Sequence, residues 1–376
     1  MTARNVFQIN PISRFGNKNV TMKRPKEFTC FSYNDQHQFI PDDSSLKYYY
    51  PPTIGADLSQ GFDKFQKFDE SSDGHLDSIL KAIIDYEKKS DRRIESDFVT
   101  WRGMMTKVES SFIEENHIYK LQSQSKQFDT ATHPGRPSQE MMTGGYKFET
   151  LCLLPQPWNE TSREYIENRE NETVNNFEQY CSIVRTALGN TTIILGGEVD
   201  GSIFHLFALL FHTLKSIVWD FKPTDCDKPI NWVELKTSVE IQSRKDFINY
   251  ERKLMKFWIQ SFLLGVPKII VGFRTPDGIL TRIEEIATDS IPRMVKTRGH
   301  STWDGNVCLN FAAEFLRFIR ETITEKGVWR IRRQAFSHEI EVFQVSETGF
   351  DGILSDDFIS WRSRITGNKN KIVYRA

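Results

Sequence analysis

Apolar residues recur with helical spacing in several segments of this chain. In residues 76–89, LDSILKAIIDYEKK, they fall three and four positions apart, which predicts an amphipathic helix. The pattern is clearest in residues 243–265, SRKDFINYERKLMKFWIQSFLLG, where Gly265 and Pro267 supply a stop signal. Further helices are predicted at the start of residues 162–188, at about 308–325 and near 356–364.

Runs rich in β-branched and aromatic residues predict strands between these helices. The main candidates are residues 191–200 (TTIILGGEVD), 230–238 (INWVELKTS) and 268–273 (KIIVGF). Residues 97–112 predict a strand or a short helix that enters the core. Other strands are predicted at the end of 162–188 and around 328–334 and 340–345. Because strands and helices alternate irregularly, the expected fold class is mixed α/β, with central mixed sheets flanked by helices.

The remaining segments are more polar. Residues 1–50 are broken by turn-forming residues, so we expect an extended N-terminal segment that wraps the surface. Residues 122–139 contain two prolines and are expected to form a loop. Since no internal repeat and no clear linker interrupts the chain, residues 1–376 are expected to form a single domain.

The most apolar segment is GSIFHLFALLFHTLKSIV, residues 201–218. Its length is marginal for a membrane-spanning helix. However, His205, His212 and Lys215 interrupt it, and a charge in mid-bilayer is costly. A buried core helix is the favoured interpretation, and no membrane partner is expected.

Composition limits the partners. The chain has 376 residues, of which 39% are hydrophobic and 26% charged, as expected of a soluble globular protein. A net charge of −1 provides no global basic field, so a nucleic-acid partner would need a local patch or metal ions. The five cysteines are scattered and form no CxxC pair, which argues against a disulfide framework or a zinc site. A reducing compartment fits this usage better.

Two pairs of charged residues carry the candidate chemistry. Glu198 and Asp200 are two apart on a predicted strand, so they share a face. Two anions that close repel by about 1 kcal/mol in water and by about 4 kcal/mol at an effective dielectric of 20, so positive charge is expected nearby. Glu234 and Lys236 share a face of the next strand in the same way. A half-exposed strand often pairs Glu and Lys on its solvent side, and this alternative stays open.

The residue types suit phosphodiester cleavage. Hard divalent cations take oxygen ligands, chiefly carboxylates. Two such ions can activate a water and stabilise the leaving oxygen. A lysine beside them can neutralise the phosphate or orient the nucleophile.

Five short blocks occur in a specific order: WRGMMTK (101–107), GYKFE (145–149), GGEVD (196–200), VELK (233–236) and FWIQSFLLG (257–265). Together they closely resemble the DXO family of RNA decapping nucleases, whose active-site core resembles that of PD-(D/E)xK nucleases. YYYPP and DLSQGF, before the first block, look most like the fungal nuclear branch, which partners an Xrn-type 5′→3′ exoribonuclease.

The resemblance implies a role for individual residues. Two Mg²⁺ (or Mn²⁺) ions would be held by Glu149, Glu198, Asp200, Glu234 and the backbone carbonyl of Leu235. These four acids carry a formal charge of −4, so without cations we expect electrostatic strain and raised acid pKa values. Catalysis would depend on Asp200, Glu234 and Lys236, with Lys236 at the scissile phosphate or attacking water.

Other residues would contact the substrate. By resemblance, Arg102 with its neighbours Trp101 and Gly103 would hold 5′ phosphates, and arginine's planar fork suits that task. Gln260, Glu198 and Lys236 would contact the RNA, and Cys181 would line its site. The alternatives are ordinary ones: Arg102 in a surface salt bridge, Gln260 capping a loop and Cys181 in the core.

The implied function is a metal-dependent RNA 5′-end quality-control hydrolase. It would remove incomplete caps, pyrophosphate from 5′-triphosphate RNA and NAD from NAD-capped RNA, each time leaving a 5′ monophosphate. It would also stabilise a partner exoribonuclease in the nucleus. The alternatives are a mainly non-catalytic, exonuclease-stimulating partner and a PD-(D/E)xK-type DNA nuclease.

One segment departs from the family pattern. The Glu-x-Asp and Glu-x-Lys strands are joined closely in the family, but here 33 residues, 201–233, separate Asp200 from Glu234. The apolar residues 201–218 are either a lineage-specific insertion over the sheet edge or a translated intron. Sequencing the mature transcript distinguishes the two.

Overall fold

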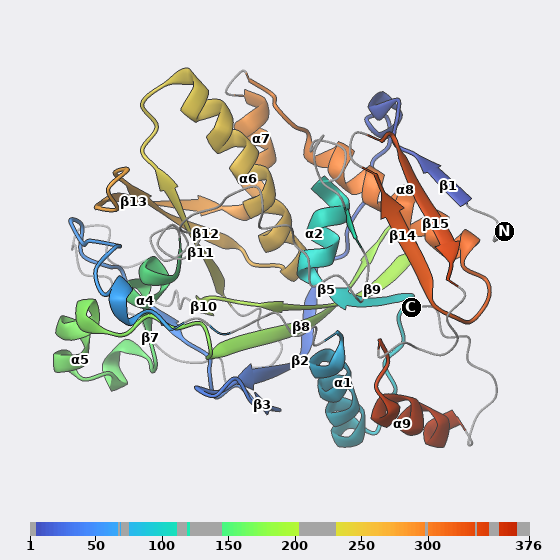
Figure 1. Cartoon of the computed structure of the whole chain (residues 1–376), viewed down its shortest axis with the longest axis horizontal. Coiled ribbons are helices and arrows are strands. Elements are labelled where there is room, and N and C mark those ends of the chain that lie inside the picture. The colour runs from blue at the N-terminus through green and yellow to red at the C-terminus, as the bar shows by residue number, and fades with distance from the viewer. Residues whose placement is uncertain are drawn as a thin grey trace, which may run out of the picture.

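The chain folds into sheets and helices that surround a shared interior (Figure 1). The computed structural model describes residues 5–66, 68, 75–110, 119–120, 145–202, 231–297, 300–334, 337–345 and 353–366. Within these residues there are three sheets, of five, six and four strands, with helices between them. The mixed α/β fold class is confirmed. The predicted loop 122–139, and the apolar segment 201–218 beyond Ser202, lie outside the described residues.

The five-stranded sheet has the order β3-β2-β8-β9-β5. Its strands are β2 (Lys26–Tyr33), β3 (Phe39–Ile40), β5 (Phe98–Trp101), β8 (Gln179–Leu188) and β9 (Thr191–Glu198). β8 and β9 form a hairpin at Gly189, whose φ of 57° is left-handed, while β5 runs parallel to β9. The predicted strand at 191–200 therefore forms, but it ends at Glu198.

The six-stranded sheet has the order β13-β12-β11-β10-β4-β7. Its strands are β4 (Tyr48–Tyr49), β7 (Leu153–Leu154), β10 (Gly201–Ser202), β11 (Trp232–Val239), β12 (Lys268–Arg274) and β13 (Leu280–Ala287). β11 and β12 are parallel and are joined by α6 (Arg244–Leu264). Ser243 and Asp246 cap the start of α6 reciprocally, and Gly265 ends it at a φ of 75°.

The chain passes from one sheet to the other between Glu198 and Gly201, since β9 and β10 belong to different sheets. Two glycines precede this crossing. A Cβ at Gly196 would lie 2.6 Å from Cδ1 of Ile79 on α1 (Asp77–Ser90), and one at Gly197 would lie 2.8 Å from Cδ1 of Leu264 on α6. The Gly-Gly pair thus lets side chains of both helices pack against β9.

The N-terminal segment is more than a surface wrap. β1 (Asn5–Gln8) pairs with β15 (Glu339–Gln344) in the four-stranded sheet, which also contains β14 (Trp329–Arg333) and β6 (Tyr119–Lys120). Phe15 and Phe31 are fully buried. The prediction for residues 1–50 was wrong in this respect, because short apolar stretches among turn residues supply strands and core side chains.

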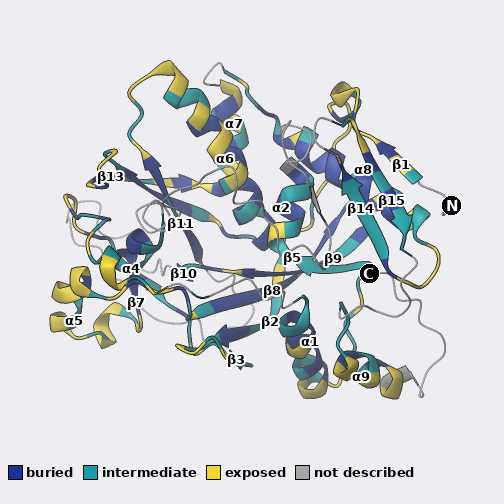
Figure 2. Cartoon of the chain, in the orientation of Figure 1, coloured by how far each residue is buried: buried dark blue, intermediate teal, exposed yellow. Residues whose placement is uncertain are grey.

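Most of the other helices have a buried side that faces inward (Figure 2), whereas residues 163–168 form a helix with no buried residue. These other helices are α2 (Arg102–Ser110), α4 (Lys147–Cys152), α5 (Arg163–Asn168), α7 (Ile291–Thr297), α8 (Gly305–Thr322) and α9 (Asp356–Thr366). α1, α8 and α9 confirm the predictions at 76–89, 308–325 and 356–364. Residues 97–112 supply both alternatives, the strand β5 followed by the helix α2. Among the described residues, no helix combines the length and the apolar character needed to cross a membrane.

A buried carboxyl lies near the end of α2. Glu109 is fully buried, and no described residue donates a hydrogen bond to either of its oxygens. Burial raises the pKa of this carboxyl to about 8, so the folded chain holds its proton more tightly than the unfolded chain does. Its ionisation therefore destabilises the fold progressively as pH rises from about 4.5 to about 8.

Replacing Glu109 with methionine is expected to raise the free energy of unfolding by about 1–3 kcal/mol, because no described residue donates a hydrogen bond to the buried carboxyl. The gain should be larger at about pH 9 than at about pH 5. Urea denaturation at both pH values measures it, and Glu321→Met, at an exposed position of α8, is the control. A destabilised Glu109→Met protein at both pH values would contradict this prediction.

Candidate active site

Glu234 is the centre of a charged cluster. It lies on β11 with its side chain fully buried, and its Oε1 is 2.7 Å from Nζ of Lys236. Arg102 donates from Nη1 to its Oε2 at 3.0 Å. The predicted shared face of Glu234 and Lys236 is confirmed. Because Glu234 has no exposed surface, the pair is not an ordinary solvent-facing strand pair.

Asp200 joins this cluster from the crossing between the sheets. Its Oδ2 accepts a hydrogen bond of 2.6 Å from the Leu235 amide and lies 3.9 Å from Nζ of Lys236. Glu198 is the last residue of β9, so the expectation that one strand carries both acids was wrong. The chain leaves the first sheet after Glu198, and this change of direction brings Asp200 to β11.

Glu149 reaches the cluster from α4. The ring of Phe148, the preceding residue, packs where a side chain on Gly272 of β12 would lie, which fixes the helix against the six-stranded sheet. A Cβ at Gly145 would be 3.5 Å from Oε1 of Glu149, so this glycine leaves room beside the carboxylate. Asp200 and Lys236 are both close enough to influence Glu149 electrostatically.

Arg102 begins α2, directly after β5. Its side chain crosses Gly197, where an added Cβ would be 3.0 Å from Cβ of Arg102. The N–H groups in the first turn of a helix have no partner within that helix and favour anions, so they suit a phosphate. Gly103, in this turn, is exposed. The indole Nε1 of Trp101 donates to the His75 carbonyl at 2.6 Å, so this side chain anchors Arg102 instead of donating to a phosphate.

Gln260 and Cys181 lie at different depths. Gln260 is half-buried on α6, one turn before Leu264, which packs against Gly197, so it faces the same region as Arg102. Cys181 pairs with Glu198 across the β8–β9 ladder, but its side chain is 2% exposed within an apolar cluster. The thiol is thus buried beside a residue of the site, and its predicted contact with the substrate stays a prediction.

The cluster has more negative than positive charge. Burial, followed by the charge of neighbouring acids, raises the pKa of Glu149 well above its usual range and that of Glu198 to about 7. Burial also raises the pKa of Asp200, to about 6, although Lys236 opposes it. Glu198 also keeps contact with solvent, which screens its charge.

Glu234 is the exception among the acids. Burial alone would raise its pKa, but the charges of Arg102 and Lys236 outweigh burial and hold the pKa below its usual value. Burial would likewise lower the pKa of Lys236, but Glu234 and Asp200 keep it raised. The expected strain is therefore confirmed at three of the four acids, while Glu234 is neutralised by the two cations.

These shifts predict a pH dependence for the cation-free protein. An acid whose pKa is raised by folding destabilises the fold as pH rises from the unfolded to the folded value, here from about 4 to about 7. In EDTA, the urea concentration at the midpoint of unfolding is therefore expected to be lower at about pH 8 than at about pH 5. Asp200→Asn, whose amide oxygen can still accept from Leu235, should reduce this fall. Asp63→Asn, at an exposed position, is the control. An equal fall of the urea midpoint in both variants would contradict the prediction.

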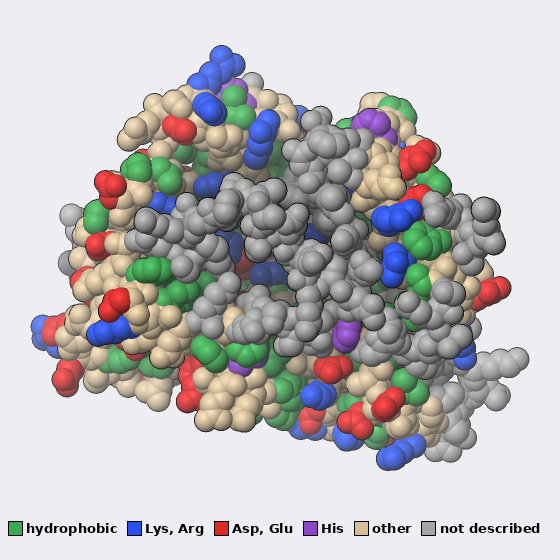
Figure 3. All heavy atoms as spheres, viewed as in Figure 1, with side chains coloured by type: hydrophobic (Ala, Val, Ile, Leu, Met, Phe, Trp, Pro, Cys, Tyr) green, Lys and Arg blue, Asp and Glu red, His purple; other side chains and the backbone are tan. Residues whose placement is uncertain are grey.

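The donor set fits a hard cation. The side-chain donors are carboxylates from Glu149, Glu198, Asp200 and Glu234, which suit Mg²⁺, Mn²⁺ or Ca²⁺. In the part of the chain that the structure describes, no three acidic, histidine or cysteine side chains form a ready-made cage. The contacts of Glu234 explain this, since both of its oxygens face Arg102 or Lys236. Figure 3 shows acidic and basic side chains together at the bottom of a hollow in the centre of this face.

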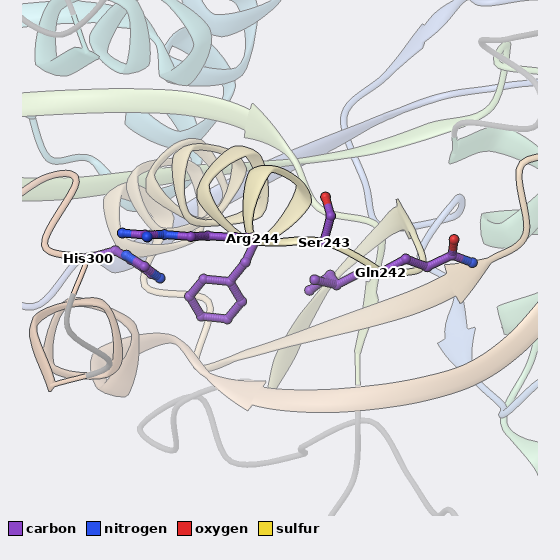
Figure 4. Close-up of a pocket in the computed structure, with 6 residues that line it drawn as sticks. Gln242, Ser243, Arg244 and His300 are labelled. Atoms are coloured by element: carbon purple, nitrogen blue, oxygen red, sulfur yellow. The ribbon is translucent and has the colours of Figure 1, made fainter.

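A separate shallow pocket lies at the beginning of α6 (Figure 4). It contains none of the predicted site residues, and the capping box of Ser243 and Asp246 already occupies the adjacent helix end. Its lining residues are Ile241, Gln242, Ser243, Arg244, Phe247 and His300. The acid cluster, not this pocket, is the candidate active site.

Fold and site together define a nuclease of the PD-(D/E)XK class, in which an acid beside one strand meets Glu-x-Lys on the next. The family model described as "RAI1 like PD-(D/E)XK nuclease" matches residues 23–359. The chain belongs to this family. The family and the enzyme class expected from the sequence are therefore confirmed.

Relatives and solved structures agree with this assignment. The chain is 51% identical over 375 residues to "Decapping nuclease RAI1" of Aspergillus fumigatus, covering 95% of this chain and 98% of that protein. The crystal structure of Candida albicans Rai1 in complex with pU5-Mn²⁺ has a TM-score of 0.81 at 28% identity and covers 96% of this chain and 100% of that one. Scheffersomyces stipitis Rai1 with (3′-NADP)⁺ and calcium has a TM-score of 0.78 at 25% identity, with 92% and 97% coverage. Both of these Rai1 structures contain a divalent cation.

Proposed function

We propose that this chain is a divalent-cation-dependent hydrolase that acts at RNA 5′ ends. Its substrates are incompletely capped, 5′-triphosphate and NAD-capped RNAs, and each reaction leaves a 5′ monophosphate. The relatives named as decapping nucleases, and the Rai1 complexes with pU5 and (3′-NADP)⁺, support this proposal. The observation that carries it is the contact of one buried carboxylate, Glu234, with two cations suited to phosphate, Arg102 and Lys236.

Each residue of the cluster has a place in this reaction. Two Mg²⁺ or Mn²⁺ ions, when bound, would activate the attacking water and stabilise the leaving oxygen. Their proposed ligands are Glu149, Glu198, Asp200, Glu234 and the carbonyl of Leu235. Lys236 lies 2.7 Å from Glu234 and 3.9 Å from Asp200, so its ammonium can hold the scissile phosphate beside these acids. Arg102, the first turn of α2 and Gln260 would hold and orient the 5′ end.

Four RNAs test this function: triphosphate-ended, unmethylated-capped, methylated-capped and NAD-capped. Each is 5′-end-labelled and incubated with the protein and Mg²⁺ or Mn²⁺, beside EDTA and Glu234→Ala controls. Release of pyrophosphate, cap dinucleotide or NAD that both controls abolish is the expected result. No release from any of the four RNAs in the presence of either cation would overturn the proposal.

We further propose that the chain acts in the nucleus and stabilises an Xrn-type 5′→3′ exoribonuclease. The support is the resemblance of its motifs to the fungal nuclear branch. The half-life of the exoribonuclease at elevated temperature, with wild-type protein, Glu234→Ala protein or neither, tests the partnership. Protection by both forms is expected, and fluorescence microscopy of a tagged chain tests the location.

A further inference from the structure

Arg102 and Glu234 contact each other in the cation-free protein, although the proposed reaction assigns the first to a phosphate and the second to a cation. The Glu234 side chain is fully buried, and that of Arg102 is 13% exposed. Nη1 of Arg102 donates to Oε2 of Glu234 at 3.0 Å, while Nζ of Lys236 lies 2.7 Å from Oε1 of the same carboxylate. A carboxylate offers about four lone-pair sites, so a cation that binds Glu234 shares this carboxylate with Lys236 and competes with Arg102 for it. A guanidinium engaged in this way is not directed at a phosphate.

We propose that Arg102 is an exchangeable counterion of Glu234 and that this exchange couples cation binding to 5′-phosphate binding. Without cations, Arg102 neutralises Glu234. A divalent cation that binds Glu234 replaces this interaction and frees the guanidinium for the 5′ phosphate. The inference rests on the proposed function, since it assigns the two ligands to that site.

The surroundings of Arg102 allow this exchange without movement of the backbone. Trp101 is anchored through its indole to the His75 carbonyl, and the base of the Arg102 side chain rests on Gly197. No atom of a described residue lies within 4 Å of the position of a Cβ at Gly103, so the described part of the chain leaves space beside the first turn of α2. Lys236 differs, because it lies near both Glu234 and Asp200 and remains among the acids when one of them binds a cation.

Linkage fixes the sign of the effect. Arg102 and the cation compete for Glu234, so removing the guanidinium must strengthen cation binding. A purely supporting role would give the opposite sign, because Arg102 would then hold Glu234 in position for the cation. The affinity of the Arg102 variant for a cation therefore separates the two roles.

The test is calorimetric titration of Mn²⁺, with no RNA, into wild-type and Arg102→Met protein. Methionine keeps the stem that crosses Gly197 and removes the charge. We expect tighter binding by roughly tenfold, within the range usual for coupled sites. Arg185→Met, at an exposed arginine on β8 of the five-stranded sheet, should bind Mn²⁺ like the wild type. Unchanged or weaker binding by Arg102→Met would overturn the inference.

A second measurement observes the wild-type protein and uses a variant only to assign one signal. The Nε–H signal of Arg102 in the NMR spectrum of the wild-type protein is assigned through its absence in Arg102→Lys. It should shift when Mg²⁺ alone saturates the site, and an unmoved signal would overturn the exchange. If the wild type binds Mn²⁺ and releases products from RNA while these tests fail, the inference falls and the proposed function stands. If it neither binds Mn²⁺ nor acts on RNA, both fall.

Discussion

Replacing Glu234 with glutamine is expected to slow pyrophosphate release from 5′-triphosphate RNA by roughly 100- to 1,000-fold or more, comparable with the loss of one transition-state contact. Glutamine keeps the size of the side chain but removes the negative charge that faces Arg102 and Lys236 at 3.0 and 2.7 Å. It also weakens a proposed cation ligand. Single-turnover rates at saturating Mg²⁺ measure the effect on the chemical step, apart from RNA binding.

The matched control is Glu240→Gln, just beyond the end of the same strand. Glu240 contacts Arg282 and Thr281 near the surface, away from the acid cluster, so its rate should stay within about twofold of the wild type. Thermal unfolding must show that Glu234→Gln remains folded. A folded Glu234→Gln protein with more than about a tenth of the wild-type rate would mean that the chemistry does not depend on this carboxylate.

The regular elements were predictable because their signals are local. α6 carries its own start in Ser243, an apolar face and its own stop in Gly265, so its limits agree with the prediction to within a residue. Strand β2 was missed because its sequence, KEFTCFSY, alternates weakly and follows many turn-forming residues. Its place between β3 and β8 depends on pairing with β8, which lies far along the chain.

The sequence predicted which residues belong to the site better than it predicted how they are arranged in space. Two-residue spacing is enough to bring Glu234 and Lys236 together on one strand. It is not enough for Asp200, whose position depends on where the chain changes sheets. The ion pair of Glu234 with Arg102 needs α2 to pass over Gly197, which is a tertiary contact that no local pattern shows. The depth of the Cys181 thiol likewise depends on tertiary packing, which the sequence does not show.

Replacing Glu87 with alanine is expected to lower the free energy of unfolding by about 3–5 kcal/mol, the usual cost of breaking a buried ion pair from one side. Glu87, on α1, is 3% exposed and lies 2.8 Å from Nη2 of Arg362 on α9. Its carboxylate also accepts hydrogen bonds of 2.9 Å from the Ile94 amide and from Nε1 of Trp361. Alanine would leave the guanidinium of Arg362, a residue 5% exposed, without its charge partner. Urea denaturation measures the loss.

Glu95→Ala is the matched control, because its side chain is 73% exposed and its contact with Arg93 is 3.6 Å long. It should change the free energy of unfolding by no more than about 0.5 kcal/mol. A loss below about 1 kcal/mol in Glu87→Ala would show that α9 is not fastened to α1 through this pair.

The same contact connects the C-terminal helix to the active site. Ile79, on α1, packs where a side chain on Gly196 would lie, two residues before Glu198. Phe358 and Trp361 of α9 still pack in the apolar cluster of α1, but loss of the ion pair weakens this attachment and with it the support of β9. Glu87→Ala is therefore expected to lower the hydrolysis rate at temperatures where the protein is still folded, although Glu87 touches no residue of the cluster. An unchanged rate in the folded variant would mean that β9 holds Glu198 in position without α1.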